Sequence, residues 1–367
     1  MLLKITILPG DGIGPEVTDE GVRVLESVAE VFGHQLSLSR KDVGGAAVQS
    51  SRDPLPKDTL LACQASHAVL LGAVGGTAFD NLSADLRPEK GLLRLRQELG
   101  VFANLRPAVC LTALEDCSPL RAEIVRGTNL LIVRELLGGI YFGERSIQGP
   151  KGNRTATDTM KYGEPEIERI ARVAFELAKS RRRKVTSVDK ANVLDCSRLW
   201  RQVVTSVSRD FSEIELQHMY VDSAAMALVS HPATFDVVLT ENMFGDILSD
   251  QAGGVVGSLG MLASTSIGGP VALYEPVHGS APDIAGRSIA NPLGSILSVA
   301  MMLRHSFGLQ TEAASVESSV ATVLAAGHRT NDLAKPGQRP LSTQEMGRKV
   351  AEAVKEHAKL PGQLSAD

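Results

Sequence analysis

The chain has 367 residues, 38 Lys and Arg residues against 42 Asp and Glu residues, and 43% hydrophobic content. This length allows two or three domains, and the formal net charge of −4 argues against a general nucleic-acid binder, which is usually basic. The four scattered cysteines include no CxxC pair, so they disfavour a disulfide framework or zinc site and favour a reducing compartment. No apolar run reaches the roughly 18 residues of a membrane span, and the first residues lack the basic start of a signal peptide. Composition therefore indicates a soluble, cytoplasmic, globular protein.

Strand-like and helix-like segments alternate along the chain, which is typical of an α/β architecture. Residues 2–8 predict a strand that ends in the glycine loop 9–14, and Pro15 then begins a helix. The most strongly patterned helix is predicted over 164–183, with acidic residues at its start and a basic run, 181–184, at its end. That run could be a nucleic-acid patch, but helix-dipole compensation and solvation are favoured. Further strands are predicted at 68–74, 129–133, 184–188 and 235–240.

Two polar segments have no helical periodicity. Residues 142–163 are rich in Gly, Thr, Lys and Arg, and their length predicts an arm, a lid or a contact segment. Residues 328–342 contain two prolines and are expected to lie on the surface.

The loop from Gly10 to Gly14 follows a strand and opens a helix, a position where free backbone N–H groups can bind an anion. Its GxGxG spacing differs from the dinucleotide fingerprint. A tight turn that needs glycine dihedrals is an equally good interpretation, and the sequence does not decide between the two.

Asp246 and Asp250 follow a predicted strand and are four residues apart, so they share one helix face. Two like charges in this geometry repel, and a divalent cation with oxygen ligands would compensate them. A solvated face or decoration of a helix N-terminus is the alternative. Asp222 follows another strand-like stretch and could supply a third ligand.

Arginines form the complementary set. Arg96 lies in a short predicted helix, Arg106 follows it, and Arg134 ends an apolar strand, where an unpaired charge is costly. Each alone could be a surface residue, but three of them beside a candidate metal site indicate a small polycarboxylate substrate.

Lys190 ends a predicted strand, and near other cations its pKa would fall, which suits a base. Tyr141 offers a phenol between glycines and suits proton donation. A structural hydrogen bond is the alternative for each. The segment 275–291 is a loop rich in Gly and Pro in which an acidic residue could accept hydrogen bonds from ribose and repel a 2′-phosphate, and an ordinary surface loop is the alternative.

Together these motifs carry a family resemblance. LPGDGIGPEV, GLLRLRQELGVFANLRP, VRELLGGIYFG, SVDKANVL, MFGDILSD and EPVHGSAPDIAGRSIANP occur in the order expected of the β-decarboxylating dehydrogenases, over about residues 4–350. The chain resembles the isopropylmalate dehydrogenase branch of that family, which also contains isocitrate, homoisocitrate and tartrate dehydrogenases.

The resemblance implies a two-domain α/β fold that is distinct from the Rossmann fold, with a mixed sheet flanked by helices and an active-site cleft between the domains. Residues 1–102 plus 257–367 would form a discontinuous cofactor-binding domain. Residues 103–256 would bind substrate and metal and dimerise, with an arm at about 142–163. A homodimer would share its active sites between subunits.

The implied reaction is NAD-dependent oxidative decarboxylation of (2R,3S)-3-isopropylmalate to 2-oxoisocaproate and CO2, a step of leucine biosynthesis. By the resemblance, Tyr141 and Lys190 would be catalytic, and Mg²⁺ or Mn²⁺ would be held by Asp246, Asp250 and the partner's Asp222. Lys190 would also come from the partner subunit. The implied substrate-binding residues are Arg96, Arg106, Arg134 and Asp222, with Glu89, Leu92, Leu93 and Val193 around the isopropyl group.

The resemblance also implies a binding site for NAD, with an Asp-Ile pair that favours NAD over NADP. Its residues would be Glu275, His278, Gly279, Ser280, Ala281, Asp283, Ile284 and Asn291. Glu241 is assigned no role.

Two rival functions remain at this point. Another β-decarboxylating dehydrogenase, acting on tartrate, methylmalate or homoisocitrate, would differ in the pocket around Glu89, Leu92 and Leu93. A non-catalytic carboxylate-binding protein would have no need for Lys190 or Tyr141. Neither a nucleic acid nor a membrane is an expected partner.

Overall fold

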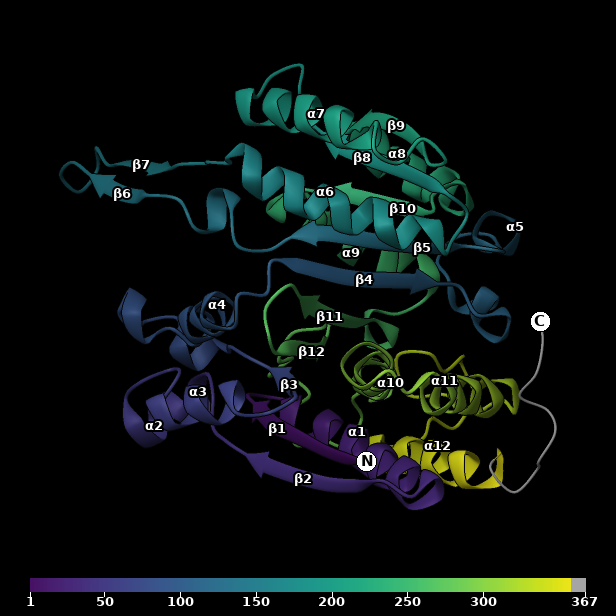
Figure 1. Ribbon diagram of the computed structural model, residues 1–367. Coiled ribbons are helices and arrows are strands. Elements are labelled where there is room, and N and C mark those ends of the chain that lie inside the picture. Colours follow the sequence, from purple (N-terminus) through teal and green to yellow (C-terminus); the bar gives the residue numbers. More distant parts are fainter. Residues whose placement is uncertain (358–367) are drawn as a thin grey trace. The chain divides into compact units, whose positions relative to one another are not determined.

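The computed structural model describes residues 1–357 (Figure 1). Its contacts group the chain into two compact units. Among the described residues, the first contains Met1–Val101, Leu111–Pro119 and 257–357, and the second contains Phe102–Cys110 and Leu120–Val256. The domains predicted from the sequence differ from these units mainly at Leu111–Pro119, which contacts the first unit although it lies within 103–256. The reason is two side-chain contacts with that unit: Arg329 donates to the carbonyl oxygen of Ala113, and Lys335 donates to the carboxylate of Asp116.

The first unit contains five strands in the order β2-β1-β3-β12-β11. All neighbouring pairs are parallel except β11 with β12. Strands β1 and β3 are nearly continuous apolar runs, as expected of parallel strands covered on both faces. The strands are β1 (Leu2–Gly10), β2 (Gln35–Arg40), β3 (Ala68–Ala73), β11 (Ala263–Ile267) and β12 (Ala272–Pro276).

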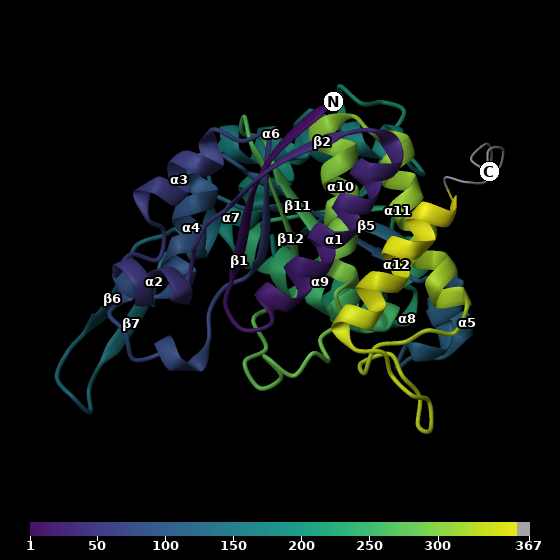
Figure 2. The same cartoon turned by 90° about the horizontal axis from the view of Figure 1, so that it is seen from below.

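Four long helices of this unit pack against one another. Helix α1 contacts both α10 and α12, and Figure 2 shows these helices side by side with α11. Pro15 stands in the first turn of α1, as predicted, and Gly33 ends that helix in the left-handed conformation. The helices are α1 (Gly14–Phe32), α2 (Gly45–Ser51), α3 (Lys57–Gln64), α4 (Pro88–Leu99), α10 (Leu293–Phe307), α11 (Gln310–Ala325) and α12 (Thr343–His357).

The larger sheet of the second unit has five strands in the order β4-β5-β10-β8-β9. Within this sheet, only the β4–β5 pair is antiparallel. The α/β class with mixed sheets and flanking helices is therefore confirmed. The strands are β4 (Ala103–Val109), β5 (Asn129–Glu135), β8 (Lys184–Asp189), β9 (Glu215–Tyr220) and β10 (Val237–Thr240).

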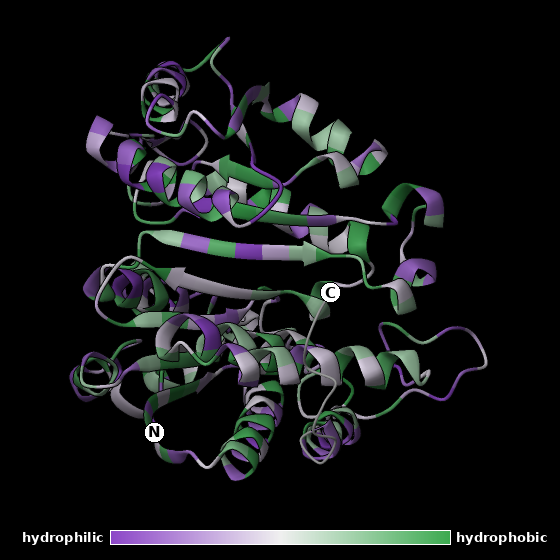
Figure 3. Cartoon of the chain, turned by 45° about the vertical axis from the view of Figure 1, so that its right-hand side comes forward, coloured by the Kyte–Doolittle hydropathy of each residue, from purple (hydrophilic) through white to green (hydrophobic). Residues whose placement is uncertain are grey.

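Helices α6 and α7 of the second unit are strongly amphipathic, and Figure 3 shows hydrophilic and hydrophobic stretches alternating along the helices of the chain. Of the apolar residues predicted for α6, Ile167, Ile170, Ala171 and Ala174 are fully buried, and Leu177 is half-buried. The helices are α5 (Ala122–Val125), α6 (Glu164–Lys179), α7 (Asp195–Ser208), α8 (Val221–Ser230) and α9 (Asn242–Val256).

Helix α6 ends earlier than predicted, at Lys179. The basic residues that follow bind the chain around Asp236: Arg181 Nε donates to Asp236 Oδ1 over 2.8 Å, and Arg182 donates to the carbonyl oxygen of Phe235. Arg183 adopts a left-handed φ of 58° and turns the chain into β8. These contacts also explain why the strand predicted over 235–240 begins at Val237, and they give the basic run a structural role.

The two polar segments take different forms. Within 142–163, strands β6 (Arg145–Gln148) and β7 (Thr155–Asp158) pair as an exposed antiparallel hairpin, which projects away from α6 in Figure 1. The expectation that 328–342 lies wholly on the surface is wrong for Thr330 and Leu333, which are 0% and 2% exposed. Thr330 donates to Asp332 Oδ1, so its hydroxyl is buried with a partner.

Candidate active site

Helix α9 carries the two aspartates on one face, four residues apart, as predicted. Glu241 stands just before the helix, and its carboxylate accepts the backbone N–H groups of Met243 and Phe244 over 3.0 and 2.7 Å. These two groups have no partner within the helix, so the carboxylate caps its first turn. The cap fixes where α9 starts after β10 and therefore where Asp246 and Asp250 lie.

Arg134, the penultimate residue of β5, points its guanidinium at the start of α9. Nη1 lies 2.5 Å from Asp246 Oδ1, while Nε and Nη2 donate to Asn242 Oδ1 over 3.0 and 2.7 Å. The residue is only 2% exposed. A buried guanidinium held by several acceptors is rigid, and removal of any acceptor would leave part of its charge uncompensated.

Arg106 on β4 reaches the same helix from the neighbouring strand. Its Nη1 lies 3.3 Å from Asp246 Oδ1 and 3.4 Å from Asp250 Oδ1, and it donates to Ser249 Oγ over 2.7 Å. Its Nε donates to Asn104 Oδ1 over 2.7 Å. The antiparallel β4–β5 pair thus places two buried arginines beside one acidic helix face.

Tyr141 completes this group. Its hydroxyl donates to Asp246 Oδ2 over 3.0 Å, and the Arg134 guanidinium carbon lies 5.7 Å from the ring centroid. Burial, followed by the negative charge of Asp246, raises the pKa of Tyr141 to about 12. The phenol therefore carries its proton at neutral pH and can act as a proton donor.

The donor set on α9 fits a hard divalent cation. Carboxylate oxygens are the ligands that Mg²⁺ and Mn²⁺ prefer. Burial, and then the nearby charge of Asp246, raises the pKa of Asp250, as expected of an acid pair that gains from added positive charge. Within residues 1–357, no three Asp, Glu, His or Cys side chains are grouped to hold a metal, so Asp222 does not join Asp246 and Asp250 in one chain.

Lys190 and Asp222 form a separate pair. Lys190 follows β8, Asp222 lies in the first turn of α8, and their Nζ and Oδ1 atoms are 2.6 Å apart. The hydrogen bond from Lys190 is the main cause that lowers the pKa of Asp222. The sequence interpretation placed other cations around Lys190, but the contact that the structure places on its ammonium is a carboxylate. The Asp222 side chain is 61% exposed.

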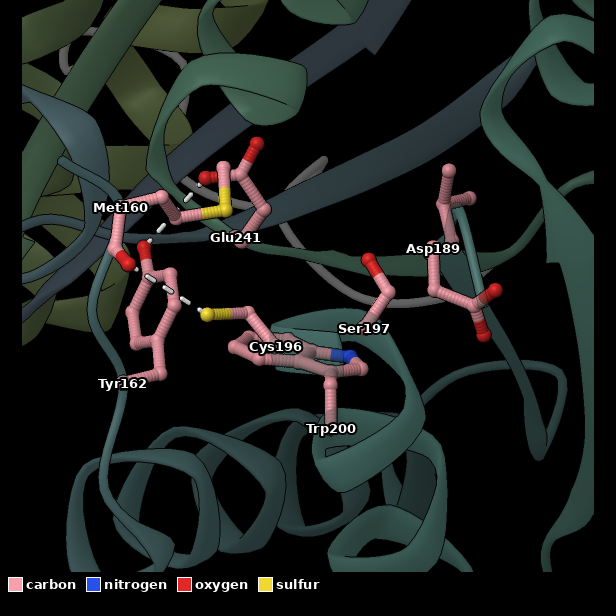
Figure 4. Close-up of a pocket in the computed structure, with 8 residues that line it drawn as sticks. Met160, Tyr162, Asp189, Cys196, Ser197, Trp200 and Glu241 are labelled. Carbon is pink, nitrogen blue, oxygen red and sulfur yellow. Dashed lines mark hydrogen bonds between the residues drawn. The ribbon is translucent and has the colours of Figure 1, made fainter. Parts of the chain in front are cut away.

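A buried layer lies behind the capped end of α9. Figure 4 shows the Tyr162 hydroxyl directed at Glu241, with Trp200 and Cys196 beside the tyrosine. The Tyr162 oxygen also accepts the N–H of Asn242 over 3.0 Å, and its ring meets Trp200 edge to face. Burial raises the pKa of Glu241 although two N–H groups favour its ionised form. Glu241 thus has a structural role that the sequence did not reveal.

In the first unit, α4 aligns part of the predicted substrate set. Glu89, Leu92, Leu93 and Arg96 are three, four and seven residues apart and share one helix face. Arg96 Nη2 lies 2.8 Å from Glu275 Oε1 on β12, and both side chains are about 10% exposed. The neighbouring Arg94 instead pairs with Asp53, over 2.7 Å.

The predicted cofactor segment is a loop between β12 and α10. Burial lowers the pKa of His278, so its imidazole is neutral at pH 7. Asp283 lies exposed on the loop. Asn291, at the end of the loop, accepts the N–H of Leu293 over 3.0 Å and donates to Asp332 over 3.0 Å. The other residues predicted to bind the cofactor lie on the same loop between His278 and Asn291, and they are Gly279, Ser280, Ala281 and Ile284.

The N-terminal glycine loop is a structural turn. Gly10 and Gly12 have φ values of 72° and 59°, and a side chain at Gly12 would meet the Ser280 carbonyl oxygen. The backbone N–H groups of Asp11, Ile13 and Gly14 all donate to carbonyl oxygens. This favours the tight-turn interpretation over anion binding at those groups.

Several supporting residues were missed by the sequence analysis. Asn104, Asn242 and Ser249 hold the two arginines, and Asp11 accepts three backbone N–H groups, from Gly45, Ala46 and Gly75. Asp11, Asn104 and Ser249 lie inside the quoted motifs, and Asn242 directly precedes one of them, so the only signal in the sequence was their position close to a charged candidate. Asn104 contacts Arg106 within β4, whereas the roles of the other three depend on contacts between residues far apart in sequence.

The structure brings Arg106, Arg134, Tyr141, Asp246 and Asp250 into one cluster, hereafter the α9 cluster. It brings Arg96 to Glu275 and Lys190 to Asp222 as two separate pairs. Val193 is 61% exposed. None of the described helices is long and apolar enough to cross a membrane.

Comparison with known proteins assigns the family. The isocitrate/isopropylmalate dehydrogenase family model matches residues 4–350. The chain is 52% identical to the 3-isopropylmalate dehydrogenase of Aquifex aeolicus, covering 95% of this chain and 96% of the relative. It is 54% identical to that of Nitratidesulfovibrio vulgaris, covering 96% and 100%. Among solved structures, the isocitrate dehydrogenase of Methylococcus capsulatus matches with a TM-score of 0.86 and 36% identity, covering 96% of this chain and 99% of that chain. With the α9 cluster in place, these matches show that the chain belongs to the isocitrate/isopropylmalate dehydrogenase family.

Proposed function

We propose that the protein oxidises (2R,3S)-3-isopropylmalate with NAD⁺ and decarboxylates it to 2-oxoisocaproate, a step of leucine biosynthesis. The observation that carries this proposal is the α9 cluster, in which two buried arginines and a tyrosine converge on an acidic helix face. The relatives that are more than 50% identical to this chain are named 3-isopropylmalate dehydrogenase, which supports the choice of substrate.

The arginines bind the carboxylates of the substrate. Arg106 and Arg134 are held by Asn104 and Asn242, so the planes of their guanidinium groups are oriented in advance for a planar carboxylate. Arg96 serves the same substrate from α4, where Glu275 holds one of its terminal nitrogens. Because these side chains are already ordered, they lose less conformational entropy when the substrate binds.

The proton transfers belong to Lys190 and Tyr141. Lys190 serves the base step at the C2 hydroxyl, with Asp222 keeping its Nζ in position over 2.6 Å. Tyr141 keeps its proton at neutral pH and delivers it to the enol carbon after CO2 has left.

Asp246 and Asp250, with Asp222 of the partner subunit as the third carboxylate, would hold Mg²⁺ or Mn²⁺. When bound, the cation supplies Lewis acidity at the C2 oxygen, and NAD⁺ supplies the oxidant. In the absence of other positive charge, Arg106 and Arg134 compensate the two aspartates.

Specificity lies in an apolar face and a loop. Leu92, Leu93, Val193 and the stem of Glu89 surround the isopropyl group, and such apolar side chains do not compensate the charge of a third carboxylate. The loop 278–291 with Glu275 binds NAD, and the exposed carboxylate of Asp283 favours ribose hydroxyls over a 2′-phosphate. The first unit is thus the cofactor-binding domain, and the second binds substrate and metal.

The functional form is a homodimer in which each subunit supplies Lys190 and Asp222 to its partner's site. Large apolar side chains are exposed on α8 and α9 of the second unit, where Met226, Val229 and Ile247 are 67%, 40% and 58% exposed. On the β6–β7 arm, Ile147 is 73% exposed. Such a set of exposed side chains is typical of an interface. The four free cysteines suit a reducing cytoplasm.

The test is NADH formation from isopropylmalate, with and without EDTA, and with NAD⁺ compared with NADP⁺. We expect metal-dependent NADH formation, a preference for NAD⁺, and the highest kcat/KM on isopropylmalate among malate, methylmalate, tartrate, isocitrate and homoisocitrate. A higher kcat/KM on one of the others would assign the chain to another branch of the family. Binding of isopropylmalate without turnover would indicate a carboxylate-binding protein instead.

A further inference from the structure

The carboxylate of Glu16 binds a loop far away in the sequence. Glu16 lies in the first turn of α1, and its two oxygens accept the backbone N–H groups of Gly286 and Ser288 over 2.5 and 3.0 Å. Both groups belong to the proposed NAD loop. A single acidic side chain thus holds one end of that loop through two charge-assisted hydrogen bonds.

The bound turn is one that the chain does not adopt readily by itself. Gly286 has a φ of 74°, which glycine tolerates, but Ser288 has a φ of 54°, a left-handed conformation that is unfavourable for a residue with a side chain. A carboxylate that accepts both N–H groups compensates for this conformation. Thr343 adds a second constraint, because its N–H donates to the Ser288 carbonyl oxygen over 3.0 Å.

The other end of the loop is fixed by the same N-terminal segment. The N–H of Ile13 donates to the Ser280 carbonyl oxygen over 2.8 Å. Ile13 and Val17 also form an apolar cluster with Ala290, against which Ala281, Ile284 and Ala285 pack. The stretch 281–285, with the exposed Asp283, therefore lies between two attachments to the start of α1.

We propose that Glu16 is a positioning residue for the NAD loop: it holds the turn at 286–288 so that the stretch 281–285 is ordered before the cofactor arrives. This inference rests on the proposed function, in which that loop binds NAD. Without Glu16, the loop must be ordered at the cost of binding free energy. Both carboxylate oxygens of Glu16 are engaged by backbone N–H groups of the loop, so its loss is expected to affect cofactor affinity and not the chemical step.

The test uses the full-length protein and the isosteric variant Glu16→Gln, which replaces one acceptor oxygen by an NH2 group that cannot accept. The control is Glu26→Gln, an exposed position ten residues further along α1 with the same change of charge. We expect the Kd for NADH, measured by its fluorescence, to rise about tenfold in Glu16→Gln and to stay unchanged in Glu26→Gln. The KM for NAD⁺ should rise similarly, with kcat and the KM for isopropylmalate nearly unchanged.

A second readout does not depend on activity. Amide hydrogen exchange of the protein without cofactor should become faster at Gly286 and Ser288 in Glu16→Gln, and Glu16→Ala should show the same change. An unchanged Kd for NADH in Glu16→Gln would overturn the inference. A fall in kcat with the KM values for NAD⁺ and isopropylmalate both unchanged would overturn it as well. If the unsubstituted protein does not bind NADH at all, the proposed function fails instead, so the two failures are distinguishable.

Discussion

Two groups of proposed catalytic residues in the second unit are built in opposite ways. In the α9 cluster, Arg134 and Arg106 are 2% and 7% exposed, and each binds an asparagine as well as an aspartate. In the other group, Lys190 and Asp222 share one ion pair, and their side chains are 27% and 61% exposed. A buried cluster couples function to stability, because each charge depends on its partners, whereas an exposed pair can be altered with little effect on folding.

Arg134→Met should have the largest effect, because it removes a guanidinium group that is proposed to bind a substrate carboxylate and that also compensates the charge of Asp246 in the folded protein. We expect loss of nearly all turnover and a loss of about 3 kcal/mol in the free energy of unfolding. This is the low end for a broken buried pair, since the Asp246 side chain is 33% exposed. Urea denaturation and NADH formation measure the two effects. Arg198→Met, which removes the exposed ion pair with Asp195, is the control and should alter stability by less than about 1 kcal/mol.

Lys190→Met should separate function from stability. Turnover is expected to fall about 10²- to 10⁴-fold, as when a general base is removed, while the free energy of unfolding changes by less than about 1 kcal/mol. Lys184→Met is the matched control, because Lys184 lies at the other end of β8 and pairs with Glu215. Normal turnover in Lys190→Met would contradict the proposed mechanism, and a large loss of stability would contradict the comparison of the two groups.

Mg²⁺ should stabilise the α9 cluster directly. A cation at about ten times its Kd adds roughly 1.4 kcal/mol to the free energy of unfolding and raises the thermal midpoint. Removal of the metal with EDTA should reverse the shift, and Asp250→Asn should remove most of it. A midpoint shift of equal size in Asp250→Asn would place the cation elsewhere.

Glu241→Gln tests the buried layer behind α9 and should have the smallest effect. Burial raises the pKa of Glu241 in the folded protein above its usual value of 4.5, so its protonated form favours folding. As pH rises through 4.5, Glu241 ionises in the unfolded chain before it ionises in the folded protein. The free energy of unfolding of the natural protein therefore falls relative to that of the glutamine variant until the pH passes the pKa of Glu241 in the folded protein. Urea denaturation at several pH values measures this difference. If the natural protein instead gained stability relative to the variant as pH rises, the hydrogen bonds from the N–H groups of Met243 and Phe244 would lower the pKa of Glu241 by more than burial raises it.

Local patterns predicted the regular elements well. The start of α1 at its proline, the apolar face of α6 and the shared face of Asp246 and Asp250 all follow from side-chain spacing within one element. The errors came from contacts outside the pattern. Helix α6 ends early because Arg181 and Arg182 bind the chain around Asp236, and Leu333 is buried in a segment whose composition indicated a surface loop.

The sequence by itself determined the α/β class, the family resemblance and the residues of the α9 cluster, because these depend on composition, spacing and ordered motifs. Only the tertiary structure decided that Asn104 and Asn242 hold the arginines, that Glu241 caps α9, and that Glu16 holds the turn at 286–288. These contacts join residues up to about 270 positions apart. The physical reason is that an acidic or amide side chain has the same local signature whether it faces solvent or binds distant backbone N–H groups, and only the packing of strands and helices determines which partner it meets.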